Sequence, residues 1–133
     1  MTVQLAGLDP QVRAAAERAL SWAKYYQIPV TVTSGYRSWA EQTRLRKQYE
    51  DCLAAGEKVY PGNPNPACRY PANEPGDSAH NYRWAWDSWV PPEYQWAWTY
   101  LRQMAGFTVP QNDPIHAEVP NWRQYLPAPL KRG

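Results

Sequence analysis

A proline- and glycine-rich segment at residues 54–77 limits most strongly how this chain of 133 residues can fold. Its turn-forming pairs are Pro61-Gly62, Asn63-Pro64, Asn65-Pro66 and Pro75-Gly76. Such pairs favour turns and do not fit the interior of a helix or a sheet. Loops of this length inside a compact domain are usually functional or disordered. The regular elements must therefore lie on either side of the loop, which we expect to be ordered by its prolines.

Two helices and a strand are expected before the loop. Apolar residues recur at helical spacing after Asp9-Pro10, which predicts a helix from Pro10 to Tyr25 or Tyr26. Residues 29–33 alternate and are rich in β-branched side chains, which predicts a strand. Ser38 and Glu41 form a capping-box pattern, which predicts a second helix running toward Asp51.

A strand, a helix and a short strand are expected after the loop. Residues 83–87 alternate, with Trp84 and Trp86 on one face and Ala85 and Asp87 on the other. Pro91-Pro92 opens a helix that Gly106 ends, and a short strand follows around residues 115–118. This order predicts a single α+β domain over residues 1–133, with a small antiparallel sheet flanked by about three helices.

Composition narrows the class of partner. The net charge is +2 and the 14 basic residues form no run, so nothing supports nucleic-acid binding. No apolar run reaches membrane-spanning length, and the first ten residues lack the pattern of a signal peptide. The chain has 8 Trp and 10 Tyr against 1 Phe. We assign Tyr82 and most of the nearby tryptophans to the core: Trp84, Trp86, Trp89, Trp96 and Trp98.

Two cysteines bracket most of the loop. Cys52 and Cys68 either pair as a local clip or stay free thiols in a reducing compartment. A structural zinc site usually includes a closely spaced cysteine pair, so a metal-binding role for these two is the weaker alternative. We expect the two residues to lie close together in space.

Four polar residues stand out because carboxylates and histidines are costly to bury among aromatic side chains. The only histidines are His80 and His116, and each has an aspartate nearby, Asp87 and Asp113. Two imidazoles and one carboxylate can supply the three protein ligands of a catalytic zinc ion. A second, metal-free carboxylate could then act as general base. The alternative is that these residues are ordinary satisfied polar groups, since short motifs arise by chance.

Three motifs together resemble one family. Ser78-x-His80-x-x-x-x-Ala85-x-Asp87 resembles the Ser-x-His-x-x-Gly-x-Ala-x-Asp signature of zinc D-alanyl-D-alanine carboxypeptidases and L-alanyl-D-glutamate peptidases, the VanY-like or LAS-type metallopeptidases. Ser34-Gly-Tyr-Arg-Ser38 with Gln42 resembles the family's Ser-Gly-Tyr-Arg-Ser-x-x-x-Gln segment, and Asp113-Pro-Ile-His116-Ala-Glu118 its closing motif. The resemblance spans residues 30–122 and implies the fold shared by hedgehog and D-Ala-D-Ala peptidases. It departs at Arg83, where the family has glycine.

The resemblance implies a role for each matching residue. His80, Asp87 and His116 would bind one Zn²⁺, and Asp113 would be the catalytic base, with Glu118 as its rival or as a partner that orients His116. Arg37 would contact a substrate carboxylate or the developing oxyanion. Ser78, Tyr36 and Gln42 would bind substrate or support these groups. The structural alternatives are a salt bridge for Asp87 or Arg37, a turn residue for Asp113, and packing for Tyr36.

The resemblance also implies a function, which is zinc-dependent hydrolysis of peptidoglycan stem peptides. We expect an L-alanyl-D-glutamate endopeptidase of the phage endolysin type, acting as a monomer and stored in the cytoplasm until host lysis, when it meets the bacterial cell wall. One alternative is a D-alanyl-D-alanine carboxypeptidase or dipeptidase. Another, from a different class and motivated by the tryptophans, is a cell-wall-binding module with little or no catalysis.

Overall fold

The computed structural model describes residues 3–127, and these residues form the predicted α+β domain. The α-helices are α1 (Pro10–Tyr25), α2 (Trp39–Ala54) and α3 (Gln95–Met104), and the strands are β1 (Thr31–Ser34), β2 (Ala85–Trp89) and β3 (His116–Glu118). Short 3-10 turns lie at Val3–Leu5, Pro66–Cys68, Ala79–Tyr82, Pro92–Tyr94 and Trp122–Tyr125. The predicted fold class, a small antiparallel sheet with three helices, is confirmed.

The three strands form one antiparallel sheet with β2 in the centre. In its register, Asp87 of β2 lies opposite Ser34 of β1 on one side and opposite His116 of β3 on the other. Cβ atoms of directly opposed residues are about 5 Å apart, so this row brings three distant parts of the sequence together.

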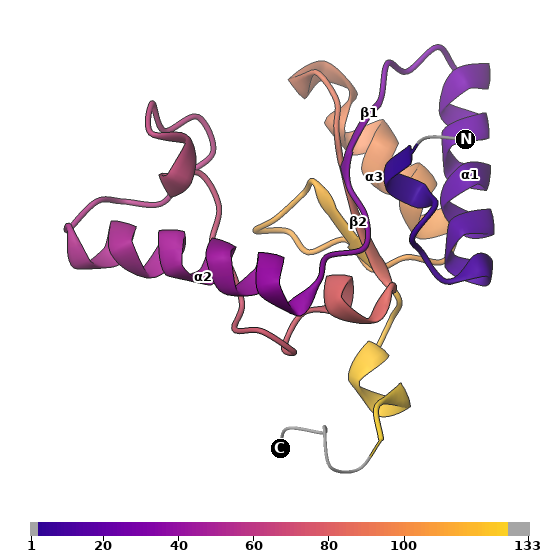
Figure 1. The fold of residues 1–133 in the computed structure, drawn as a ribbon. Coiled ribbons are helices and arrows are strands. Elements are labelled where there is room, and N and C mark those ends of the chain that lie inside the picture. The colour runs from indigo at the N-terminus through magenta and orange to yellow at the C-terminus, as the bar shows by residue number, and fades with distance from the viewer. Residues whose placement is uncertain (1–2, 128–133) are drawn as a thin grey trace.

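The two faces of the sheet have different environments. Helices α1 and α3 lie on one side of the strands, and α2 extends away on the other (Figure 1). On the α1/α3 side Trp86 packs edge-on against Trp98 and Phe107, within a core that α1 completes with small side chains. Since neighbouring strand residues point to opposite faces, Asp87 is directed toward the side that carries α2.

Two of the tryptophans assigned to the core are exposed, and that assignment was wrong. Trp96 is 77% exposed and Trp89 is 49% exposed, whereas Trp98 is fully buried. Two positions along a helix correspond to a rotation of about 200°, so Trp96 and Trp98 cannot both face the core. Trp89 is the last residue of β2 and lies on the face opposite the core-facing Trp86 and Ser88.

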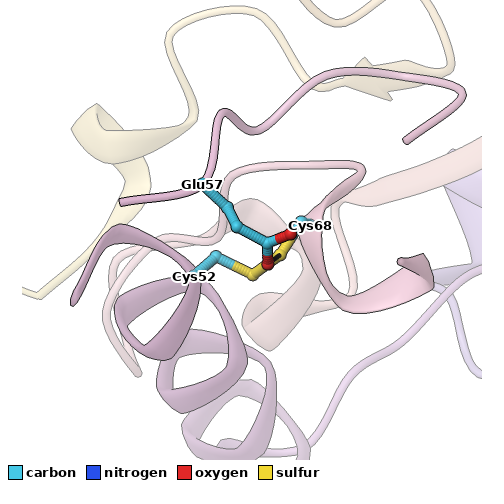
Figure 2. Close-up of side chains that lie close together, drawn as sticks. All are labelled: Cys52, Glu57 and Cys68. Carbon is cyan, nitrogen blue, oxygen red and sulfur yellow. Dashed lines mark hydrogen bonds between the residues drawn. A yellow bond between two sulfur atoms is a disulfide. The ribbon is translucent and has the colours of Figure 1, made fainter. Parts of the chain in front are cut away.

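Helix α2 is tied to the proline-rich loop at several points along its length. Gln42 donates a hydrogen bond to the carbonyl of Asn73 (2.8 Å), and Arg46 donates one to that of Ala72 (2.9 Å). Near the end of the helix, Cys52 forms a disulfide with Cys68 (Figure 2). The part of the loop from Cys68 to Asn73 is therefore attached to α2 at both of its ends.

None of the helices within residues 3–127 combines the length and the apolar character that a membrane-spanning helix requires.

Arg83, which stands where the resembled family has glycine, adopts the left-handed conformation, with φ of 69°. This backbone ends the 3-10 turn Ala79–Tyr82, so β2 begins at Ala85 and not at residue 83 as predicted, and Trp84 precedes it. The arginine side chain gains contacts that glycine lacks. Its guanidinium donates to the carbonyl of Gly7 (2.7 Å) and lies 4.0 Å from the ring centroid of Tyr36.

These contacts predict an ordered series of stabilities at position 83. Arg83→Ala keeps the strained backbone and loses the contacts, whereas Arg83→Gly loses the contacts but relieves the strain. We expect the Ala variant to have the lower free energy of unfolding, by about 1 kcal/mol, in urea denaturation. An Ala variant as stable as the Gly variant would show that the left-handed backbone costs nothing here.

Candidate metal centre

Two of the proposed ligands are cross-strand neighbours and the third comes from the turn before β2. Asp87 and His116 are paired in the register of β2 and β3. His80 lies in the 3-10 turn Ala79–Tyr82, whose N-cap is Ser78; the Ser78 hydroxyl accepts a hydrogen bond from the His80 amide (3.3 Å). Ser78 thus fixes the backbone of a candidate ligand.

The three side chains converge on one point. Asp87 Oδ1 lies 3.2 Å from His80 Nε2 and 3.2 Å from His116 Nδ1, and the three atoms all lie within 4.8 Å of one another. The other nitrogen of each imidazole has an acceptor of its own. His80 Nδ1 is 2.8 Å from the carbonyl of Gly35, and His116 Nε2 is 2.6 Å from Glu118 Oε1. These acceptors favour a proton on each outer nitrogen, so Nε2 of His80 and Nδ1 of His116 are the nitrogens directed at a metal.

Gly35, whose carbonyl faces His80, lies where no side chain fits. A Cβ atom on Gly35 would lie 1.8 Å from the carbonyl oxygen of Gln4, so no other residue fits without moving that backbone. The Ser-Gly-Tyr-Arg segment therefore contributes a backbone acceptor to the site as well as its side chains.

The group fits a tetrahedral metal ion. Ligands about 2.0–2.1 Å from a zinc ion in tetrahedral geometry are about 3.3 Å from each other, close to the two 3.2 Å separations found here. His80 and Asp87 are buried and the side chain of His116 is 12% exposed, so bulk water competes little for these atoms. Two imidazoles and a carboxylate leave a fourth position, as in catalytic zinc sites.

Without a metal, the charges of the group stabilise one another. Burial opposes ionisation of Asp87, yet the two imidazoles beside it hold the pKa of this carboxyl well below its usual range. Burial likewise disfavours the charged form of His116, but hydrogen bonds to Asp87 and Glu118 raise its pKa to about 9. The metal-free site therefore holds a proton on His116 at neutral pH, which a metal must displace.

Arg37 reaches the same carboxylate from the turn after β1. Its guanidinium donates to Gln42 (3.1 Å) and to Ser34 (3.3 Å) and lies 3.4 Å from Asp87 Oδ2. Gln42 is almost fully buried, and it holds Arg37 with one end of its amide and the loop carbonyl of Asn73 with the other. The salt bridge considered as the alternative for Asp87 is therefore present, formed with Arg37 rather than Arg83, and it leaves Oδ1 for the imidazoles.

Asp113 lies beside the group with an unsatisfied carboxylate. Its Oδ1 is buried and has no hydrogen-bond partner among residues 3–127. Burial, followed by the negative charge of Asp87, raises the pKa of Asp113, and the neighbouring cationic groups oppose that rise. Asp113 therefore combines a free acceptor atom with greater basicity than an exposed aspartate has.

The remaining predicted site residues fall into two groups. Glu118 and Ser78 contact His116 and His80 respectively, so their positions fit support of the proposed ligands. Tyr36 lies apart from this site, because its 41% exposed ring stacks on Arg83 and does not line the cavity over the three ligands.

A cavity of about 340 Å³ opens over the group. One wall is formed by α2 and the loop attached to it, including Leu45, Pro66, Tyr70 and Pro71. A second wall is formed by the segment before β3: Pro110, Asn112, Asp113 and Ile115. The three candidate ligands also line the cavity: His80, Asp87 and His116. The proline- and glycine-rich loop at residues 54–77 thus forms part of the cavity wall.

The disulfide lies behind this loop wall. Glu57 Oε2 is 3.1 Å from Cys68 Sγ, which places a carboxylate beside the two sulfur atoms (Figure 2). Because the sulfurs are bonded to each other, neither is a thiolate that could bind a metal in this state. The pairing that the sequence left open is therefore a local clip.

Sequence reasoning missed the residues that support the site from the core side. Arg102 is fully buried in α3 and donates to the carbonyl of Pro114, and Ser88 donates its amide to the carbonyl of Ile115. Arg102 appears in the sequence only as a charged residue within a mostly apolar helix, and no short motif marks it.

No family model and no curated protein matches the chain, but solved structures share its fold. The vancomycin-resistance D,D-pentapeptidase VanY, solved with Zn(II), matches with a TM-score of 0.64 and 18% identity over 84% of this chain and 72% of its own. VanYB in complex with D-alanine-D-alanine gives a TM-score of 0.68 at 18% identity, over 84% and 71%. The L,D-carboxypeptidase DacB of Streptococcus pneumoniae gives 0.60 at 18%, over 88% and 68%. The chain has the fold of the VanY-type peptidases.

The proton on His116 predicts how metal affinity depends on pH. Below about pH 9 a metal must displace that proton, so the apparent Kd for Zn²⁺ should fall about tenfold per pH unit between pH 7 and 8.5. Competition with a chromophoric chelator, corrected for the chelator's own titration, measures this slope. Glu118→Gln removes one of the two groups that raise the pKa and should flatten the slope at the upper end of the range, whereas the exposed Glu41→Gln should not. A Kd independent of pH would contradict the assigned protonation.

Proposed function

We propose that this protein is a zinc-dependent peptidase that hydrolyses peptide bonds in peptidoglycan stem peptides. One observation carries the proposal. Three candidate ligand atoms converge, each imidazole has an acceptor at its outer nitrogen, and the cavity they line also contains Asp113, whose buried Oδ1 has no partner among residues 3–127. The VanY-type fold, the Zn(II) of one related structure and the D-alanine-D-alanine of another support the choice of metal and substrate class.

His80, Asp87 and His116 would hold the ion. When bound, Zn²⁺ supplies Lewis acidity, which polarises a carbonyl group and makes water more acidic at neutral pH. The chain's own contribution is to fix the ligands: the Gly35 carbonyl and the Glu118 carboxylate each accept a hydrogen bond from the outer nitrogen of one imidazole.

Asp113 would move the proton. Its free Oδ1 accepts a proton from the attacking water, and the same carboxyl then donates it to the departing amine nitrogen. Its raised pKa suits a base that must take a proton and release it again near neutral pH. Glu118 is less suited to this step because its Oε1 already holds His116.

Arg37 would orient the substrate. It is the only lysine or arginine among the residues that line the cavity, so a substrate carboxylate or the developing oxyanion has this one cationic partner within the described part of the site. Gln42 and Ser34 hold its guanidinium in place, which reduces the entropy lost when substrate binds.

The bond between L-alanine and D-glutamate is the first candidate for cleavage, as expected in the sequence analysis; the motifs themselves are shared by endopeptidases and carboxypeptidases. A second candidate is the bond before a terminal D-alanine, because related structures at TM-scores of 0.60 and 0.64 are named as a carboxypeptidase and a D,D-pentapeptidase. An endolysin role, cytoplasmic storage and a monomeric state remain predictions of the sequence.

Replacing the proposed base separates catalysis from binding. Asp113→Asn should lower kcat for purified cell-wall peptides about 10²–10⁴-fold while leaving the Kd for Zn²⁺ within a few-fold. Chelation should abolish activity of the unmodified protein and Zn²⁺ should restore it. The exposed Asp51→Asn is the matched control. If wall degradation survives both Asp113→Asn and chelator, the peptidase proposal is wrong; wall binding without any hydrolysis would favour the non-catalytic wall-binding module.

A defined muropeptide distinguishes the two candidate bonds. Cleavage after L-alanine creates a fragment with a new N-terminal glutamate, whereas carboxypeptidase action releases free D-alanine. We expect the glutamate fragment in mass spectra of the digest, in keeping with the endopeptidase that is the first candidate. Release of D-alanine alone would assign the second function.

A further inference from the structure

Arg102 is a charged residue buried where an apolar one would ordinarily be found. Its relative exposure is 0%, and it lies on α3 next to Trp98 and Leu101, on the face that packs on the core. It forms no ion pair within residues 3–127, and its Nη1 is buried without a hydrogen-bond partner there. Burial lowers the pKa of Arg102 to about 10, and the negative charges of Asp87 and Asp113 only partly oppose this. A chain that keeps an unpaired buried cation bears a desolvation cost that a methionine would avoid.

The strongest contact of Arg102 is to the segment that carries Asp113. Its Nη2 donates to the carbonyl oxygen of Pro114 at 2.7 Å, and weaker contacts to Thr99 (3.3 Å) and to the Trp98 carbonyl (3.4 Å) set the direction of the guanidinium. Proline has no backbone N–H, so its carbonyl is the only backbone group through which position 114 can be held by a hydrogen bond.

Every carbonyl of the turn from Asp113 to Ile115 has a donor. The His116 amide donates to Asp113 (3.0 Å), Arg102 donates to Pro114, and the Ser88 amide of β2 donates to Ile115 (2.9 Å). Two of these donors belong to strands of the sheet, His116 to β3 and Ser88 to β2. The donor to Pro114 comes instead from helix α3, which packs on the core face of the sheet. Without it, the residue between Asp113 and Ile115 would lose its main tether to the core.

We propose that Arg102 is a positioning residue that holds the Pro114 carbonyl and thereby fixes Asp113 over the candidate metal centre. This deepens the proposed function and rests on Asp113 being the base. The direction of the contact supports it: the guanidinium approaches from the core side, so it can set the backbone of the turn without entering the cavity or touching substrate. Small errors in the placement of a catalytic group are costly to rate, and a backbone tether of this kind limits them.

The test compares two substitutions at the same position. Arg102→Met keeps length and apolar volume but removes the donors, and we expect kcat to fall about 10–100-fold with KM within twofold. Arg102→Lys retains one donor in reach of the Pro114 carbonyl and should recover kcat to within about fivefold of the original. Arg44→Met, which removes an exposed guanidinium paired only with Glu41, is the control and should change neither constant. A purely structural role would lower the melting temperature and leave kcat per folded molecule unchanged, which would overturn the proposal.

A second readout does not depend on activity. Loss of the tether should speed hydrogen exchange at the His116 and Ser88 amides in Arg102→Met, with amides of α1 unaffected. If the unmodified chain hydrolyses no stem peptide, the proposed function fails, yet these two exchange rates still test the tether. Unchanged rates in a folded Arg102→Met variant would overturn it.

A variant outside position 102 covers the case in which Arg102→Met does not fold. Gln95 Nε2 is a weaker donor to the same carbonyl, at 3.4 Å. Gln95→Leu should lower kcat about two- to fivefold with KM unchanged, as expected for loss of a weaker tether to the same group. If Gln95→Leu keeps full kcat and normal exchange at His116 and Ser88, the carbonyl of Pro114 does not need holding and the inference is wrong.

Discussion

Asp87 is the residue on which the site depends, because it is the point where three strands and a turn meet. The register of the sheet places it opposite Ser34 and His116, and the turn Ala79–Tyr82 adds His80. A carboxylate at this depth is costly unless cations or strong donors surround it. Two imidazoles and the guanidinium of Arg37 meet that need in the metal-free chain, so the same geometry that stabilises the carboxylate also assembles a metal site.

The residues on either side of Asp87 in β2 explain how such a small domain can support the candidate metal site. Trp86 and Ser88 face the core, where Trp98 packs against the indole and donates to the Ser88 hydroxyl at 2.8 Å. Asp87 points the other way, so a rigid aromatic core directly underlies the candidate ligands. Loss of packing at Trp86 would therefore be felt at the metal site as well as in stability, because one strand serves both faces.

Local patterns in the sequence predicted the elements and the candidate ligands, but not how the site is supported. Alternation in β2 correctly separated Trp86 from Asp87, whereas the sequence marked Arg83 only as a departure from the family's glycine and the structure shows its left-handed backbone. Trp96 was wrongly assigned to the core, because two positions along a helix turn it away from the face that carries Trp98. Arg102 could not be identified, since its partner is a backbone carbonyl twelve residues away that only the fold brings near.

The two walls of the cavity are held by different contacts, so we expect one wall to affect substrate binding and the other to affect the chemical step. The loop wall is fastened to α2 by Gln42, Arg46 and the disulfide of Cys52 with Cys68, none of which touches Asp113. The opposite wall carries Asp113 and His116 and is tied to the core through Arg102 and Ser88. Loosening the first wall should act mainly on substrate binding, because the ligands and the proposed base stay in place. Loosening the second should act on the chemical step, because it moves the proposed base relative to His80 and Asp87.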